Sequence, residues 1–211
     1  VNKVVRYQAG TKPTAITGSG NTNMGSASLV AGVVDPVTGN FLIGKIKNQA
    51  VYLWAWTGNG YSALGSVKNL SLPDDGLNGD MAFDGAGNLY VVSSTNPDWT
   101  GSVSVNITLV KQSDIAAAVA ANDQNRAIIG SNVFGKDIKA GSGFNGIAFD
   151  SNGYLYVGNH TPLLKYDPNT WGTPVKISNK MSSSKDLSSC STPPTLTVAK
   201  NLPNGRAVPG D

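Results

Sequence analysis

The sequence predicts an all-β fold built from repeated hairpins, and three observations support this. One pattern occurs three times, at residues 31–44, 78–91 and 145–157: an apolar strand, a turn that holds Asp and Gly, and a second apolar strand. Residues 103–110, between two copies, alternate between apolar and polar as a half-buried strand does. Charged residues are 14% of the chain, against roughly 25% in soluble globular proteins, and turn-forming residues take their place.

The spacing of the copies predicts a β-propeller. The turn aspartates Asp35, Asp84 and Asp150 lie 49 and 66 residues apart, and a four-stranded blade takes about 40 to 50 residues. The first interval therefore fits one blade, and the second carries an insertion. An Asp that opens a β-turn accepts backbone hydrogen bonds, so we expect a structural role for these three side chains.

In the first unit, the hairpin of residues 31–44 is followed by an expected third strand over 51–56, a turn over 57–60 and a fourth strand over 62–67. Ahead of this unit, residues 3–7 resemble residues 163–166, which suggests that the chain opens in the middle of a blade.

The insertion belongs to the second unit, after its strand at 103–110. There, Ser113 is expected to cap a short helix over 114–121, because a Ser side chain can accept a hydrogen bond from the first amides of a helix.

The third unit shows the plan most clearly. Strands are expected at 146–150, 154–158, 162–167 and 174–178, with the Asp-Pro-Asn-Thr sequence of residues 167–170 as the last turn.

Residues 1–181 thus make about three and a half blades, whereas closed propellers have about four to eight. An open stack would expose apolar sheet faces. We therefore expect a partial propeller that further sequence or another copy of the chain completes. The alternative is a compact four-bladed ring, whose last blade joins the N-terminal strands to a C-terminal one.

The C-terminal part differs in composition. Residues 182–194 are rich in Ser and end in Pro193-Pro194, which predicts an extended linker. Residues 195–200 alternate as one strand, so residues 195–211 are expected to begin a second domain of β-sandwich type.

Charge and cysteine content narrow the possible partners. The net charge is +3 without a basic cluster, which does not suggest nucleic acid, and no apolar run approaches the roughly 20 residues of a membrane span. Cys190 is the one cysteine, so neither a disulfide within the chain nor a metal site built from cysteines can form. It is either an unpaired surface thiol or the partner of a cysteine outside this chain.

The hairpin pattern Asn-Gly-x-Ala-Phe-Asp-x-x-Gly-x-Leu-Tyr-Val resembles the blades of six-bladed propellers of the NHL and gluconolactonase groups, over roughly residues 24–180. Such blades serve lactonases, lyases, receptors and adhesins, so the resemblance implies the fold more than an activity. Residues 190–201 resemble the entry to repeat domains in large actinobacterial surface proteins, which implies a secreted or cell-wall-attached bacterial protein.

The resemblance to gluconolactonases implies a candidate metal site at the mouth of the propeller channel. An Asn of this Asn-Gly type binds a divalent metal in those enzymes, so Asn78 or Asn145 could do so, with Asp80 nearby. Oxygen ligands suit Ca²⁺ or Mg²⁺. However, the Glu-Gly-Pro segment of those enzymes is absent, and Ile147 stands where Asp80 stands in the second unit. The alternative is that Asn-Gly turns the chain into the inner strand.

Three further residues are candidates for ligand binding. Trp54 and Trp56 share one face of a strand, because side chains alternate with period two, and there they could bind a sugar or a protein partner. They could instead fill the space between adjacent blades. His160 is the only histidine and could act as a base, although no catalytic triad spacing accompanies it. The alternative is an ordinary histidine in a loop.

From the sequence we expect a non-catalytic surface protein that presents a propeller face for adhesion or for binding a protein or glycan partner, without a required cofactor. The alternatives are a metal-dependent hydrolase of the lactonase type, with Ca²⁺ as a possible metal, and a carbohydrate-binding module.

Overall fold

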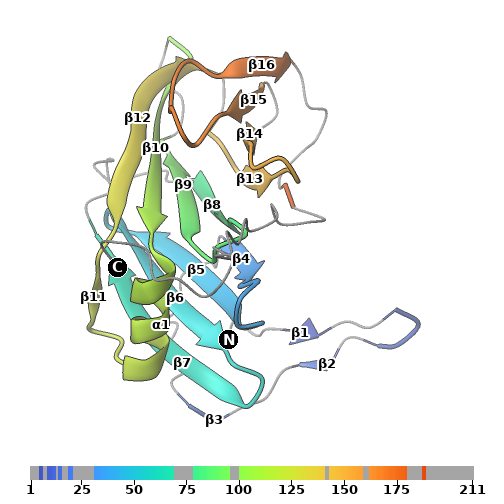
Figure 1. The fold of residues 1–211 in the computed structure, drawn as a ribbon, viewed down its shortest axis with the longest axis vertical. Coiled ribbons are helices and arrows are strands. Elements are labelled where there is room, and N and C mark those ends of the chain that lie inside the picture. The colour runs from blue at the N-terminus through green and yellow to red at the C-terminus, as the bar shows by residue number, and fades with distance from the viewer. Residues whose placement is uncertain are drawn as a thin grey trace, which may run out of the picture.

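A computed structural model describes residues 5–6, 9–12, 14–15, 19–20, 31–68, 78–95, 100–140, 143–158, 162–179 and 187–188. These residues form mainly β-strands and one short helix, as predicted (Figure 1). The strands form three sheets, each with a core of four antiparallel strands. Two further short strands, β1 (Val5–Arg6) and β2 (Thr14–Ala15), form a separate antiparallel pair.

The first sheet follows the chain in order, each strand antiparallel to the next. Two short strands from elsewhere in the sequence, β3 (Ser19–Gly20) and β11 (Ala127–Ile128), pair in parallel with its last strand. The four strands of its core are β4 (Ala31–Val34), β5 (Phe41–Lys47), β6 (Ala50–Trp56) and β7 (Gly60–Val67).

The second and third sheets repeat this plan. The second contains β8 (Asn78–Phe83), β9 (Leu89–Ser94), β10 (Ser102–Val110) and β12 (Ser131–Lys139). The third contains β13 (Gly146–Phe149), β14 (Leu155–Gly158), β15 (Leu163–Tyr166) and β16 (Val175–Ser178). The expected strands of all three units are confirmed, with bounds that shift by a few residues.

The first strands of the three sheets lie next to one another, since β8 contacts both β4 and β13 (Figure 1). Strands β8, β9 and β10 of the second sheet are mostly buried, and all six residues of β9 are buried. The outer strand β12 is mostly exposed. Leu89 and Val91 pack into a core shared with the first sheet, whereas Tyr90 and Val92 pack into a core shared with the third. Side chains that alternate between two faces therefore stack the three sheets.

The aspartates of the repeat act as turn residues, as predicted. In each turn one carboxylate oxygen, Oδ1, accepts a backbone N–H two residues on: Val37 for Asp35 at 2.8 Å, Ala86 for Asp84 at 3.0 Å and Asn152 for Asp150 at 2.9 Å. The glycine that ends each turn has a positive φ of 72° to 85°, which glycine adopts without strain.

The helical insertion connects β10 to β12 and packs against the first sheet. The helix α1 (Gln112–Ala121) contacts β7, and Ile115 and Ala118 are buried in the core between the first two sheets. The cap predicted at Ser113 is wrong, because the helix begins at Gln112, two residues earlier than expected. The N-cap position is Lys111, which makes no capping side-chain bond, and the Gln112 N–H donates to Asn88 Oδ1 at 3.1 Å. A turn of the second sheet thus caps the helix.

The pairing among the described residues bears on the organisation of the chain only in part. The N-terminal strand β1 pairs with β2, and no closed ring of sheets is formed in the described part of the chain. That the chain opens in the middle of a blade stays a prediction. The expected linker at 182–194, apart from residues 187–188, and the domain start at 195–211 lie outside the described residues. Among the residues that the structure describes, no helix reaches the length and apolarity that a membrane crossing demands.

Candidate functional site

The sequence placed a candidate metal site near the first strands of the sheets. There, Asp80 makes a hydrogen bond that joins two of these strands. Asp80 is 5% exposed, and its Oδ2 accepts the backbone N–H of Ile147 at 2.9 Å. This bond joins β8 of the second sheet to β13 of the third. Since buried carboxylates need hydrogen bonds, the bond accounts for a charged residue at this depth.

Asn78 and Asn145 lie on the same two neighbouring strands. Asn78 begins β8, and its side chain lies so close to Gly143 that a Cβ at Gly143 would overlap it. Asn145 directly precedes β13, and its N–H donates to the Gly158 carbonyl at 3.2 Å, which supports the alternative that Asn-Gly guides the chain into the strand. Within the described residues, no three His, Cys, Asp or Glu side chains are grouped to hold a metal ion. Metal binding at these residues stays a prediction.

A pocket beside the first strands of the three sheets is mainly apolar. It has a volume of about 250 Å³, and β4, β8 and β13 contribute Val33, Met81 and Ile147 to its wall. Leu187 and Ser188 line it as well. The described lining includes neither Asp80 nor another carboxylate, so it offers apolar contact more than metal ligands.

The two candidate tryptophans lie on the outward face of the first sheet, the face turned away from the second sheet. Trp54 forms a buried cluster there with Ile43, Tyr61 and Ala63, and Trp56 packs at its margin. The rings of Trp56 and Tyr61 are 5.0 Å apart. All described members of this cluster belong to the first sheet, so in this part of the chain the tryptophans do not fill a space between two sheets.

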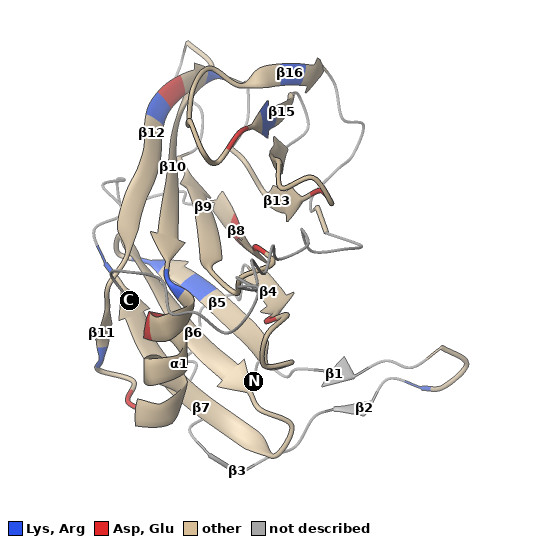
Figure 2. Cartoon of the chain, viewed as in Figure 1, with Lys and Arg blue, Asp and Glu red and all other residues tan. Residues whose placement is uncertain are grey.

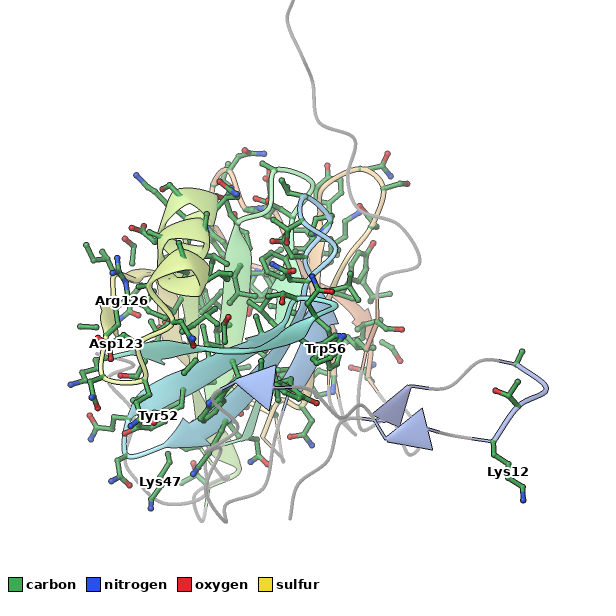
Figure 3. All side chains as sticks on the ribbon, turned by 90° about the horizontal axis from the view of Figure 1, so that it is seen from below. Lys12, Lys47, Tyr52, Trp56, Asp123 and Arg126 are labelled. Atoms are coloured by element: carbon green, nitrogen blue, oxygen red, sulfur yellow. The ribbon has the colours of Figure 1, made fainter. Side chains whose placement is uncertain are left out.

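A second pocket, of about 300 Å³, opens on this outward face. Its wall combines the β5–β6 hairpin with the loop that follows α1, two segments that lie far apart in the sequence. Figure 3 shows Lys47 and Tyr52 at the end of the sheet where Asp123 and Arg126 also lie, while Trp56 lies farther along it. The described lining residues are Lys45, Lys47, Asn48, Tyr52, Leu53, Trp54, Ala63, Gly65, Gln124 and Asn125.

Hydrogen bonds to β7 hold the loop after α1 against the pocket. Asn122 ends the helix in the left-handed conformation, with φ 47°, and its Oδ1 accepts the N–H of Ala63 at 2.9 Å. The carbonyl of Arg126 accepts the N–H of Ser66 at 2.9 Å. Between these two bonds, Gly65 has φ 103°, and a Cβ there would overlap the Arg126 carbonyl. Glycine at this position therefore allows the loop to approach.

Trp54 is the one lining side chain with an unsatisfied polar atom among the described residues. It is 6% exposed, and its indole Nε1–H has no hydrogen-bond acceptor. Leaving such a donor unpaired costs about 1–3 kcal/mol. An unpaired donor beside a pocket is thus a feature that a ligand could satisfy.

Tyrosines in the cores of the molecule are held in their neutral form. Burial raises the pKa of Tyr61, on the outward face of the first sheet. Burial, together with the charge of Asp84, raises the pKa of Tyr90 to about 12. These phenols are therefore packing groups and not bases at neutral pH.

The structure brings together only part of what the sequence suggested. It places Trp54 at the pocket and Trp56 beside the same cluster, whereas His160 and Cys190 lie outside the described residues. Sequence reasoning missed Lys45, Lys47 and Tyr52. Tyr52 carried a signal, because it stands two residues before Trp54 on β6, whereas the lysines reach this face through the pairing of β5 with β6. It had no means to find Gln124 and Asn125, whose position depends on how the insertion folds back.

Comparison of the chain with models of known protein families and with curated protein sequences found no match. The case for a function therefore depends on the geometry above.

Proposed function

We propose that this chain is a β-propeller segment of a secreted or wall-attached bacterial surface protein, and that it acts as a non-catalytic binding module. The observation that carries the proposal is the pocket of about 300 Å³ on the outward face of the first sheet. It offers an aromatic wall, amide groups and ammonium groups, which are the groups that recognise ligands by stacking and hydrogen bonding.

The propeller part of the proposal is supported by the arrangement of the sheets. Each of the three sheets begins with the strand that lies nearest the other sheets, and β8 stands between β4 and β13. In propellers the first strands of the blades surround a common axis. A second copy of this chain, or further sequence, would complete the ring. Sedimentation velocity tests closure by copies: a concentration-dependent oligomer is expected, and a monomer at all concentrations contradicts closure by copies.

The lactonase-type alternative is less well supported, because Asp80 is bonded to the Ile147 amide and the pocket beside it is apolar. Asp80→Ala should therefore destabilise the fold by about 1–3 kcal/mol, since it leaves the Ile147 N–H unpaired, and it should do so equally with Ca²⁺ or EDTA. A large stabilisation by Ca²⁺ that Asn145→Ala abolishes would favour the enzyme instead.

Binding and turnover can be separated directly. The purified chain is screened on a glycan array and against purified extracellular proteins, and in parallel is incubated with aliphatic and sugar lactones in a pH-stat. The proposal expects saturable binding without acid release. The proposal would be overturned if nothing binds on the array and the chain hydrolyses a lactone faster than buffer does, in a reaction that requires a divalent metal.

The carbohydrate-binding alternative has one observation in its favour. Tyr52 and Trp54 both line the pocket and come from the same face of β6, so they form adjoining aromatic surfaces. Aromatic faces are suited to contact with the apolar face of a sugar ring. Array signals from glycans, more than from proteins, would select this form of the proposal.

A further inference from the structure

We propose that the pocket between the β5–β6 hairpin and the loop after α1 binds an acidic carbohydrate, one whose sugar rings carry carboxylate groups. This inference rests on the proposed binding function and names the ligand class. Hereafter we call this pocket, defined by the ten lining residues given above, the hairpin pocket.

The charges of the hairpin pocket favour an anion. Lys45 and Lys47 lie on the same face of β5, two residues apart, and no acidic residue is among the described residues of the lining. Lys45 already has an interaction within the chain, so the exposed Lys47 is the ammonium group that we assign to a ligand carboxylate. Figure 2 shows basic positions on β5 and beside β11, on this part of the first sheet. The neighbouring Asp123 accepts the Asn125 N–H at 2.9 Å, so one of its oxygens is bonded to the loop itself. Ammonium groups bind carboxylates through charge-assisted hydrogen bonds.

The uncharged groups favour a sugar as the carrier of that charge. Asn48, Gln124 and Asn125 are exposed at the rim, and each side-chain amide has both donors and an acceptor that suit hydroxyl groups. Tyr52 and Trp54 supply an aromatic wall. A volume of about 300 Å³ is at the small end of ligand pockets, so one or two sugar rings are the expected occupants.

A second observation that favours a ligand comes from Trp54. Its Nε1–H is unpaired and the side chain is 94% buried in the wall of the hairpin pocket. The nitrogen itself is covered in the structure, so a ligand oxygen would reach it only if the indole turned toward the pocket. Pairing this donor on binding would remove the cost of leaving it unsatisfied.

The pocket is built on rigid supports, which lowers the entropy cost of binding. The β5–β6 hairpin turns through Asn48 and Gln49, both in the left-handed region with φ 52° and 56°, as in a two-residue primed turn. On the opposite wall, Asn122 and Arg126 fix the loop to β7. Both walls are therefore held in place by hydrogen bonds, one of which is accepted by the side chain of Asn122.

The test measures binding of oligogalacturonate, its fully methyl-esterified form and inorganic phosphate by isothermal titration calorimetry, with tryptophan fluorescence as a second readout. We expect the acidic oligosaccharide to bind and to change the fluorescence. We expect the ester to bind at least about tenfold more weakly, because it keeps the rings and loses the charge. Equal binding of the acid and the ester, or binding of phosphate as tight as that of the acid, would overturn the inference.

Variants locate the site. Lys47→Gln should weaken binding of the acidic oligosaccharide about five- to tenfold, whereas Lys176→Gln, the same charge change on β16 of the third sheet, should not. Trp54→Phe keeps an aromatic ring and removes the N–H, so a loss of about two- to tenfold is expected. Thermal unfolding checks that each variant is folded. Equal effects of Lys47→Gln and Lys176→Gln would mean that general charge and not this pocket binds the ligand.

The outcome also separates this inference from the proposed function. If the array shows binding of a neutral glycan or a protein and oligogalacturonate does not bind, the binding module stands and the acidic ligand is wrong. If nothing binds and a lactone is hydrolysed, both are wrong.

Discussion

The outward faces of the first and third sheets differ, although both sheets share one four-stranded plan. On the first sheet, Trp54 and Tyr61 are each 6% exposed and sit in an aromatic cluster. On the third, the face opposite the shared core carries Tyr154, Lys165 and Val175, of which Tyr154 is 36% and Val175 61% exposed. On this face Lys165 Nζ lies 3.7 Å from the centre of the Tyr154 ring.

The repeat therefore determines the strands of the sheets but not which side chains lie on their outer faces. The repeated hairpin supplies the first two strands of each sheet, whose turns share the same aspartate bonds. The later strands differ between the sheets, and the first sheet also gains the segment from α1 to β11 along β7. That segment turns an aromatic face into a walled pocket.

The largest expected effect contrasts Trp54→Ala with Tyr154→Ala. Removing the buried indole should lower the free energy of unfolding by about 3–5 kcal/mol, because it takes away a large core side chain. Removing the exposed Tyr154 should cost less than about 1 kcal/mol. Urea denaturation of both variants measures the difference. Similar losses would mean that the two faces are equally buried and would break the comparison.

A smaller contrast tests the attachment of the insertion to the first sheet. Gly65→Ala should cost about 2–3 kcal/mol, because the φ of 103° strains any side chain and the new Cβ would overlap the Arg126 carbonyl. Gly39→Ala, also at positive φ but with nothing within 4 Å, should cost about 1 kcal/mol.

Hydrogen exchange of the Ser66 amide, which donates to Arg126, provides the structural readout for this pair. Faster exchange is expected in Gly65→Ala and not in Gly39→Ala. Unchanged protection in Gly65→Ala would show that the loop does not depend on this glycine.

On the third sheet, the contact between Lys165 and Tyr154 should be weak. A double-mutant cycle of Lys165→Gln and Tyr154→Leu, followed by thermal denaturation, should give a coupling energy of about 0.5–1 kcal/mol, as for exposed cation–π pairs. A coupling well above this range would mean that this face is desolvated, as the face of the first sheet is.

The smallest effect is a pH dependence at the first sheet. Burial raises the pKa of Tyr61 above its ordinary value of 10.0. Between that value and the raised pKa, the folded state keeps a proton that the unfolded state loses, so stability falls as pH rises above about 10. Tyr61→Phe should make this fall shallower, and Tyr90→Phe provides the matching comparison in the core between the second and third sheets. Identical slopes for wild type and Tyr61→Phe, measured by urea denaturation from pH 8 to 11.5, would contradict the burial argument.

The strands and turns were predictable because their signals are local. Alternation of apolar residues predicted β10, and Asp with Gly predicted the turns at Asp35, Asp84 and Asp150. The helix was predicted as well, but not its start, since its first amide is capped by Asn88 from a distant turn. The sequence near the helix cannot predict a capping residue that comes from another part of the chain.

The candidate site residues likewise include some that local sequence predicted and some that it did not. The shared face of Trp54 and Trp56 followed from period two, and their cluster lies on that face. The role of Asp80 was not predictable, because its partner is the amide of Ile147, 67 residues away. The same holds for Gln124 and Asn125 in the hairpin pocket.

By itself, the sequence determined the hairpin repeat, the turn aspartates and the faces on which side chains of each strand lie, because these depend on residues only a few positions apart. The tertiary structure alone decided that β9 is buried on both sides, that Asp80 joins β8 to β13, and that the insertion forms one wall of a pocket on the first sheet. Those features depend on how separate sheets and loops pack, and packing joins residues that no local pattern connects.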